Sequence, residues 1–207
     1  MTPPVEAVLF DFGGVLSTSP FDAFERHERV HGVPSGFIRS LNATNPHDNA
    51  WARLERNEVN FDQFCEAFEA EAVAAGGRID ARELFATMAG EMRPEMVEAV
   101  RRCHDHFKTG LLTNNFITPT TTSRHHDVFD LFDVVIQSAV VGVRKPDPRF
   151  YLMACEALGI GPSAAVFLDD LGVNLKPARA LGMQTIKVTD PTEALVELEA
   201  ILGIALR

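Results

Sequence analysis

The sequence predicts an α/β protein, with a parallel-sheet core and an all-helical segment inserted after its first strand. The core is expected because short apolar runs, each ending at a polar residue, alternate with helical patterns along much of the chain. Strands that alternate with helices favour a parallel sheet covered on both faces. The insertion is expected because residues 18–92 contain helical patterns only. We therefore divide the chain into a core of residues 1–17 and 93–207 and a helical insertion of residues 18–92.

The first strand is predicted at residues 5–10, a short apolar run that leads into Asp11 and the permissive turn Gly13-Gly14. Strands with the same pattern are predicted at residues 110–112, 164–168 and 183–188, and a fifth over residues 132–140. Prolines open two of the core helices, at Pro94 and Pro148, because proline is favoured at the first helical position. Two further core helices are predicted, one ending near residue 181 and one over residues 192–202.

Within the insertion, helices are predicted near residues 21–30, 46–56, 60–75 and 80–89. Asn60 and Gln63 have the spacing of a capping box at the start of the third of these helices. Phe61, Phe64 and Phe68 recur at helical spacing, which predicts a face packed into a core. An insertion at this point is well placed to cover a ligand bound at the end of the first strand.

Composition and charge narrow the class of partner. The 207 residues are 46% hydrophobic and 23% charged, which is enough to build a substantial core. The net charge of −10 argues against sequence-independent binding to nucleic acid or to an anionic membrane, so a small-molecule or protein partner is expected. The first residues lack the basic region of a signal peptide, and the longest apolar stretch, residues 131–143, is too short to span a bilayer. A cytoplasmic location is the expectation.

The cysteines predict no disulfide framework. Cys65, Cys103 and Cys155 are odd in number and match no CxxC spacing, so we interpret them as buried thiols. A zinc site formed by Cys103, His104 and His106 is a weak alternative, because two histidines so spaced on one helix point to different faces.

The residues that carry chemistry follow the predicted strands. Asp11, Thr113 and the pair Asp169-Asp170 each come directly after an apolar run. Ligands bind at the carboxyl ends of the strands in an open parallel sheet, so these residues are expected at one edge. Converging carboxylates repel one another, and a hard divalent cation, Mg²⁺ above all, relieves that repulsion. Asp11 taken alone could equally be a turn former, but the second acidic strand end favours a metal site.

Lys145 is one of only four lysines, and it stands directly before Pro146 in a segment that proline holds extended. It can neutralise a carboxylate and a phosphate together, or it can be a solvated surface lysine. Thr113 and Asn114 offer a hydroxyl and an amide to phosphate oxygens, or they only cap a turn.

These segments resemble, in order and spacing, the four motifs of the haloacid dehalogenase (HAD) superfamily of aspartate-nucleophile hydrolases. They are Asp11-Phe12-Gly13-Gly14-Val15, Thr113-Asn114, Lys145-Pro146 and Phe167-Leu168-Asp169-Asp170. The resemblance implies a Rossmann-like core with residues 18–92 as an all-helical C1 cap. Residues 166–183 are similar to the N-terminal phosphatase domain of soluble epoxide hydrolases. The sequence contains no GxSxG elbow, so epoxide hydrolysis is not implied.

The resemblance implies a Mg²⁺-dependent hydrolase of a small phosphorylated metabolite. Asp11 is then the nucleophile that becomes an aspartyl phosphate. The implied metal ligands are Asp11, the carbonyl of Gly13 and Asp170, with Asp169 acting through a water molecule. Asn174 would support the metal loop from behind.

The implied substrate contacts come from other loops. Thr113, Asn114, Lys145 and Gly14 would hold the phosphoryl group, and Thr113 and Lys145 join Asp11 as the catalytic residues. Trp51, Arg53 and Arg56 of the insertion either reach the leaving group or are a packed tryptophan with solvated arginines.

The sequence departs from the phosphatase pattern at Gly13. Phosphatases of the superfamily carry there an aspartate that acts as the general acid, and losing such a group costs about 10²- to 10⁴-fold in rate. Three outcomes stay open: a phosphatase for good leaving groups, one whose acid comes from the insertion or the substrate, or a weakly active relative.

Two alternatives also stay open, one within the same superfamily and one from a different class of protein. A 2-haloacid dehalogenase is disfavoured because those enzymes resemble D-x-Y-G-T at the first motif and need no metal, whereas this chain has Gly13 and Asp169-Asp170. A non-catalytic module that binds a phosphorylated ligand is disfavoured by the retained Asp11, Lys145 and Asp170. The physiological substrate and the oligomeric state are not specified by the sequence.

Overall fold

The computed structural model describes residues 4–88, 90–116 and 126–207. Its centre is a five-stranded parallel sheet with the strand order β3-β2-β1-β4-β5. The strands are β1 (Ala7–Phe10), β2 (Lys108–Thr113), β3 (Val134–Gln137), β4 (Ala165–Asp169) and β5 (Gln184–Lys187). The predicted α/β fold with a Rossmann-like sheet is confirmed.

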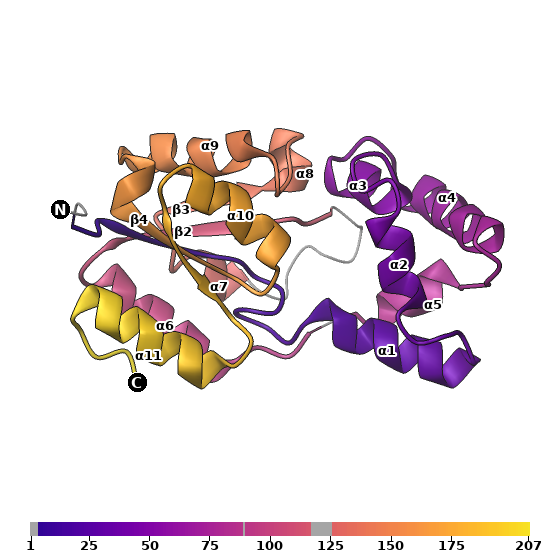
Figure 1. Ribbon diagram of the computed structural model, residues 1–207, viewed down its shortest axis with the longest axis horizontal. Helices are drawn as coiled ribbons and strands as arrows, with labels where there is room; N and C mark the ends of the chain where they lie inside the picture. Colours follow the sequence, from indigo (N-terminus) through magenta and orange to yellow (C-terminus); the bar gives the residue numbers. More distant parts are fainter. Residues whose placement is uncertain (1–3, 89, 117–125) are drawn as a thin grey trace.

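Helices cover both faces of this sheet (Figure 1). One face carries α6 (Pro94–His104) and α11 (Pro191–Leu202), and the other carries α9 (Pro148–Leu158) and α10 (Gly172–Ala180). Side chains alternate along a strand, so in β1 Val8 and Phe10 pack in the first layer while Ala7 and Leu9 pack in the second. All four residues of β1 are fully buried, as expected for a central parallel strand.

The connections around β3 differ from the prediction. The strand is shorter than expected, and the chain continues into α8 (Ser138–Val141), which ends at Gly142 in the left-handed conformation. Two further short elements are α7 (His126–Phe129) and a 3₁₀ turn, η1 (Pro162–Ala164). A continuous apolar run has no periodicity that separates a strand from a following helical turn, so the sequence predicted one strand there.

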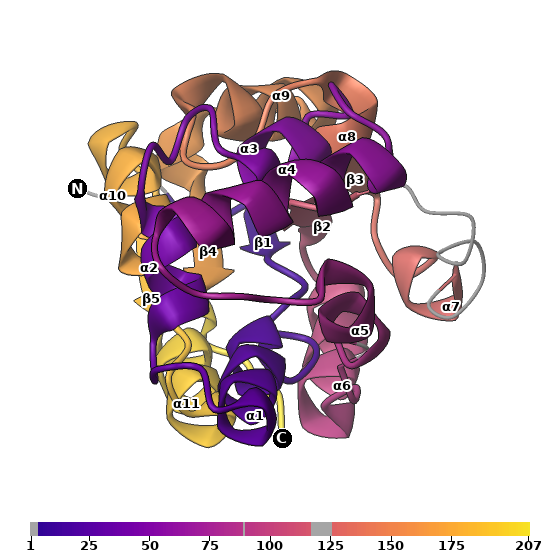
Figure 2. The ribbon, with the colours of Figure 1, turned by 90° about the vertical axis from the view of Figure 1, so that its right-hand side faces the viewer.

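The inserted segment forms five helices beside the carboxyl ends of the strands (Figures 1 and 2). They are α1 (Pro20–His31), α2 (Phe37–Ala43), α3 (Ala50–Glu55), α4 (Phe61–Ala74) and α5 (Ala81–Ala86). The capping box of Asn60 and Gln63 opens α4 as predicted. The helix α2 was not predicted, because its N-cap residue is Gly36, which has no side chain to cap the helix.

A second core holds these inserted helices together. Trp51, Phe64 and Phe68 are buried in it, and the rings of Trp51 and Phe64 meet edge to face at 5.1 Å between centroids. The predicted buried face of α4 is therefore confirmed at Phe64 and Phe68, while Phe61 is partly buried.

The chain enters and leaves the inserted segment through two linkers that lie side by side. Thr18 N–H donates to the Glu91 carbonyl at 2.8 Å, and Arg93 N–H donates to the Leu16 carbonyl at 2.8 Å. Ser17 pairs with Met92 in a short antiparallel bridge. The two ends of the helical segment thus leave the core at the same place, although they are far apart in sequence.

Cys65, Cys103 and Cys155 are free and buried, which confirms their interpretation as buried thiols. Within the described ranges, no helix has both the length and the apolar character of a membrane span.

Candidate active site

Three carboxylates converge at the carboxyl edge of the sheet. Asp11 directly follows β1, Asp169 is the last residue of β4, and Asp170 comes next. These two strands pair in register up to Phe10 and Leu168, and Asp11 N–H donates to the Leu168 carbonyl at 2.9 Å. One carboxylate oxygen from each acid lies within 4.8 Å of those of the other two. The topology therefore brings together acids that the sequence separates widely.

Lys145 completes this acidic cluster. It lies between α8 and α9, and its side chain is only 1% exposed. Its Nζ is 2.8 Å from Oδ1 of Asp11 and 2.8 Å from Oδ2 of Asp169. The alternative of a solvated surface lysine is therefore wrong.

The charged groups of the cluster shift one another's pKa values. Burial raises the pKa of Asp11 well above its usual range, against the opposing effect of Lys145. Burial and the neighbouring Asp169 raise the pKa of Asp170 to about 6. Burial alone would lower the pKa of Lys145, but Asp11 and Asp169 outweigh it and raise that pKa. Three carboxylates with one ammonium group leave excess negative charge, and this set of oxygen donors fits a hard divalent cation.

Asn174 of α10 positions the carboxylate of Asp169 by hydrogen bonds. Nδ2 of Asn174 donates to both carboxylate oxygens of Asp169 at 3.1 Å, and Leu171 N–H donates to Oδ1 at 2.8 Å. The Asn174 carbonyl in turn accepts from the Tyr151 hydroxyl at 2.7 Å. Asn174 thus lies where a residue supporting the metal loop is expected.

Thr113 and Asn114 lie at the end of β2, next to the cluster. Thr113 is buried. Asn114, however, uses its side-chain amide on Lys145: Nδ2 donates to the Lys145 carbonyl at 3.0 Å, and Oδ1 accepts from the Lys145 N–H at 2.8 Å. Both polar atoms of this side chain thus contact the backbone of Lys145, and the contact of Asn114 to phosphate oxygens that the resemblance implies stays a prediction.

The two glycines after Asp11 differ sharply in the space around them. Gly14 has a φ of +77°, and a β-carbon there would lie 2.2 Å from Oδ2 of Asp170. At Gly13 the nearest heavy atom to an added β-carbon is Cδ of Pro20, at 3.4 Å, an ordinary contact. Gly14 is therefore required for the close approach of the two loops, and Gly13 is not required by space.

Several residues that sequence reasoning did not single out contact the site. The Ser19 hydroxyl lies 3.4 Å from Oδ2 of Asp170. Arg93 donates to the Gly14 carbonyl at 2.6 Å. Arg144, next to Lys145, pairs with Glu55 of α3. Only the position of Arg144 beside Lys145 offered a signal in the sequence.

Of the candidate residues in the inserted segment, Trp51 is buried among aromatic rings, including Phe116 that follows β2. Arg56 pairs with Glu58 and donates to the His47 carbonyl, and Arg53 is exposed. The packed tryptophan flanked by arginines is thus the arrangement that the structure contains.

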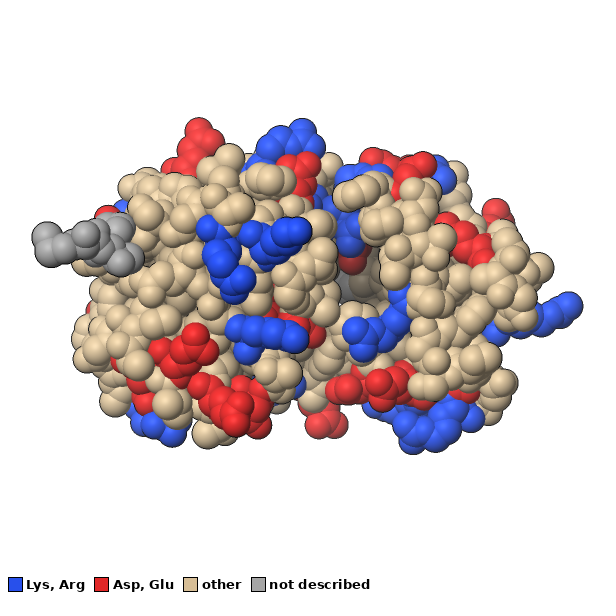
Figure 3. All heavy atoms as spheres, viewed as in Figure 1, with Lys and Arg blue, Asp and Glu red and all other residues tan. Residues whose placement is uncertain are grey.

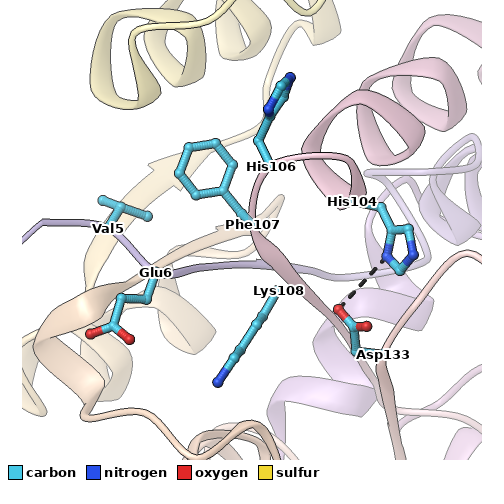
Figure 4. A pocket seen from close by; sticks show the side chains of 7 residues that line it. All are labelled: Val5, Glu6, His104, His106, Phe107, Lys108 and Asp133. Carbon is cyan, nitrogen blue, oxygen red and sulfur yellow. Dashed lines mark ion pairs between the residues drawn. The ribbon is translucent and has the colours of Figure 1, made fainter.

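His104 and His106, the histidines of the alternative zinc site, directly precede β2 and so lie at the amino edge of the sheet, away from the acidic cluster. Figure 4 shows their surroundings. His104 and His106 border a shallow pocket there, and Nδ1 of His104 is 3.7 Å from Oδ2 of Asp133. Cys103 is fully buried. Among the described residues, the group of metal-type side chains close enough to share an ion is Asp11, Asp169 and Asp170.

Comparison with known proteins gives a family match over most of the chain. Residues 5–182 match the model of the haloacid dehalogenase-like hydrolases. The chain is 36% identical over 206 residues to acyl-CoA dehydrogenase family member 10 of Mus musculus, covering 97% of this chain and 19% of the relative. It is 33% identical over 219 residues to bifunctional epoxide hydrolase 2 of Sus scrofa, covering 98% and 40%. The chain thus spans less than half the length of either relative.

Phosphatase MT3486 of Mycobacterium tuberculosis is 30% identical over 197 residues, which cover 89% of this chain and 87% of that protein. Among solved structures, a predicted HAD-like family hydrolase from Porphyromonas gingivalis has a TM-score of 0.69 at 18% identity, covering 98% and 100% of the two chains. A HAD family enzyme from Bacteroides thetaiotaomicron, solved in complex with magnesium and inorganic phosphate, has a TM-score of 0.61 at 18% identity, covering 88% and 93%.

Proposed function

The chain belongs to the haloacid dehalogenase-like hydrolases, and from this premise we propose that it is a Mg²⁺-dependent phosphomonoesterase acting on a small phosphorylated metabolite. The observation that carries the proposal is the position of Lys145, whose Nζ lies 2.8 Å from both Asp11 and Asp169 inside a cluster of three carboxylates. A relative covered over most of its length is named a phosphatase, and a protein of the same fold was solved with magnesium and phosphate.

Asp11 is the proposed nucleophile. Its Oδ1 contacts Lys145 and accepts from the Phe12 N–H at 2.7 Å, so we assign the attack on phosphorus to Oδ2. The new bond from Oδ2 to phosphorus forms as the bond to the leaving oxygen breaks, giving an aspartyl phosphate. Water then hydrolyses this intermediate, which releases phosphate and restores Asp11.

Asp11, Asp170 and the Gly13 carbonyl are the proposed metal ligands, with Asp169 reaching the metal through a water molecule. Bound Mg²⁺ would offset the negative charge of the carboxylates and of the incoming phosphate. Lys145 and Thr113 are the proposed contacts to the phosphoryl oxygens, with the backbone at Gly14 beside them. Asn174 holds Asp169 in place.

With Gly13 at this position, we propose that no side chain there assists protonation of the leaving group. The aspartate that donates this proton in related phosphatases is missing, so leaving groups that depart without a proton are expected to react best. Residues 18–92 are proposed to be the cap that covers the site, since the helices of this segment lie beside the carboxyl ends of the strands (Figure 2).

The proposal is tested by phosphate release from p-nitrophenyl phosphate, whose leaving group needs little protonation. Turnover is expected with Mg²⁺, and a chelator should abolish it. Asp11→Asn keeps the size of the side chain but replaces the carboxylate by an uncharged amide, which is a far weaker nucleophile, and it should lower turnover by on the order of 10³-fold or more. Far-ultraviolet circular dichroism and thermal unfolding confirm that the variant is folded.

Equal, negligible turnover of wild type and Asp11→Asn would overturn the phosphatase assignment. Chloride release from a 2-chloro acid without metal would then point to a dehalogenase. Tight binding of inorganic phosphate without turnover would point to a ligand-binding relative.

A further inference from the structure

Arg144, the residue before Lys145, connects the core to the inserted helices. Its Nε lies 2.5 Å from Oε2 of Glu55, the last residue of α3, and its Nη1 donates to the Pro46 carbonyl at 2.9 Å. Both partners belong to the inserted segment, whereas Arg144 belongs to the loop between α8 and α9. One side chain therefore bridges the two parts of the molecule with an ion pair and a hydrogen bond.

This bridge lies where the two parts approach each other. The helix α3 packs beside α8, directly before the Lys145 loop (Figure 1). A space-filling view shows a hollow between the two parts, with basic and acidic side chains at its rim (Figure 3).

The bridge is also shielded from water. The Glu55 side chain is 14% exposed and the Arg144 side chain 22%. Burial raises the pKa of Glu55, while the positive charges of Arg144 and then Lys145 oppose this rise. Partly buried ion pairs are screened far less than fully exposed pairs, and removing one partner leaves the charge of the other without compensation.

The backbone of Lys145 is therefore held from two directions. On the core side, the amide of Asn114 binds both its N–H and its carbonyl. On the side of the inserted helices, the neighbouring residue Arg144 is anchored to Glu55 and Pro46. The ammonium group between Asp11 and Asp169 depends on where this backbone lies, and displacements of about 1 Å in an active site cost on the order of 10²-fold in rate.

We propose that Arg144, anchored by Glu55, is a positioning residue for Lys145. Lys145 then takes its place between Asp11 and Asp169 only while α3 is docked against the core, so docking of the inserted helices and assembly of the catalytic charges are one event. This inference rests on the proposed phosphatase function and extends it to residues that do not touch the substrate.

The test uses Glu55→Gln, Arg144→Gln and the double variant, in the full chain with Mg²⁺ and p-nitrophenyl phosphate. Each single variant is expected to lower kcat about tenfold with KM within about twofold, because only the productive fraction of the enzyme falls. The double variant should be no worse than either single one, since both break the same contact. Arg144→Lys keeps the charge and should recover part of the kcat lost in Arg144→Gln.

Two exposed ion pairs supply matched controls. Arg149→Gln breaks the pair between the first turn of α9 and Asp147 of the Lys145 loop, and Arg82→Gln breaks the pair with Asp62 on the inserted helices. Both should leave kcat unchanged, which shows that the loss of an arginine charge is not itself the cause.

Hydrogen exchange provides a second readout that does not depend on turnover. The amides of Lys145 and Asp147 are hydrogen-bonded, to Asn114 Oδ1 and to the Arg144 carbonyl, and they should exchange faster in Glu55→Gln than in wild type. Unchanged exchange, or unchanged kcat in a folded variant of an active parent, would overturn the positioning role and leave the phosphatase assignment intact. A wild type without turnover would overturn the phosphatase assignment itself.

Discussion

Gly14 lies so close to Asp170 that a β-carbon on the glycine would stand 2.2 Å from Oδ2 of the aspartate. The loop after β1 and the loop after β4 thus meet without room for a single methyl group. Gly13, one residue earlier, has ordinary contact distances around it. The pair offers a direct comparison between a glycine that the site requires and one that it tolerates.

Gly14→Ala is expected to displace Asp170 and to strain the backbone at a φ of +77°. We expect metal-dependent turnover to fall below detection and the free energy of unfolding to drop by about 1–3 kcal/mol or more. Gly13→Ala should change that free energy by less than about 1 kcal/mol. Urea unfolding of both variants measures the difference, and equal losses would contradict this account of the loop contact.

The missing general acid at Gly13 predicts that the rate of turnover depends steeply on the leaving group. Wild-type turnover should fall strongly from aryl to alkyl phosphates, because the alkoxide needs a proton that no residue at position 13 supplies. Gly13→Asp has space for its β-carbon, 3.4 Å from Pro20 Cδ, and should raise alkyl phosphate turnover at least tenfold, toward the range of about 10²- to 10⁴-fold typical of a general acid.

Rates across a series of phosphate esters, measured for wild type and Gly13→Asp, test this dependence. The slope of rate against leaving-group pKa should be shallower in the variant. A flat series in wild type would mean that another group already donates the proton.

Lys145→Met should affect folding as well as turnover. The substitution leaves Asp11 and Asp169 buried together without their shared cation, and removing one partner of a buried ion pair costs about 3–5 kcal/mol. Lys187→Met, at an exposed lysine on β5, is the matched control and should cost little. Chemical denaturation at neutral pH compares the two, and similar stabilities would argue against a structural role for the Lys145 charge.

The burial of His27 predicts that the inserted helices lose stability when the pH falls. Burial, aided by the nearby His31, lowers the pKa of His27 below the usual value of 6.5. The unfolded chain then binds more protons than the folded one as pH falls below 6.5, so stability contributed by neutral His27 is lost on acidification. His27→Phe should therefore lose less stability between pH 7 and pH 5 than wild type.

Thermal unfolding across this pH range compares His27→Phe with His106→Gln, a substitution at an exposed histidine of the core. Parallel curves for wild type and His27→Phe would exclude the effect.

The sequence predicted the sheet and the acidic cluster because both depend on local patterns and on one rule of topology. Apolar runs that end in Asp11 and in Asp169-Asp170 mark the strand ends, and parallel strands place those ends at one edge. The start of α4 was predictable for a similar reason, since its capping box is formed by residues three positions apart.

Contacts between distant segments could not be predicted in this way. Asn114 and Lys145 are 31 residues apart, and nothing in either local sequence says that the amide of one binds the backbone of the other. The pairing of Glu55 with Arg144 likewise depends on how the inserted helices pack against the core. The short helix α8 was missed because its residues continue an apolar run without a change of period.

The paired linkers at residues 16–18 and 91–93 also bear on how the sheet assembles. β1 ends at Phe10 and β2 begins at Lys108, so their pairing closes a loop of roughly a hundred residues. Once the linkers are joined, the unpaired chain between the strands shortens to about two dozen residues, which lowers the entropic cost of closure by about 1 kcal/mol. Pairing of the linkers thus offsets part of the closure cost that the inserted residues impose on the sheet, and Thr18→Val, which loses the hydroxyl contact to the Glu91 N–H, should refold more slowly.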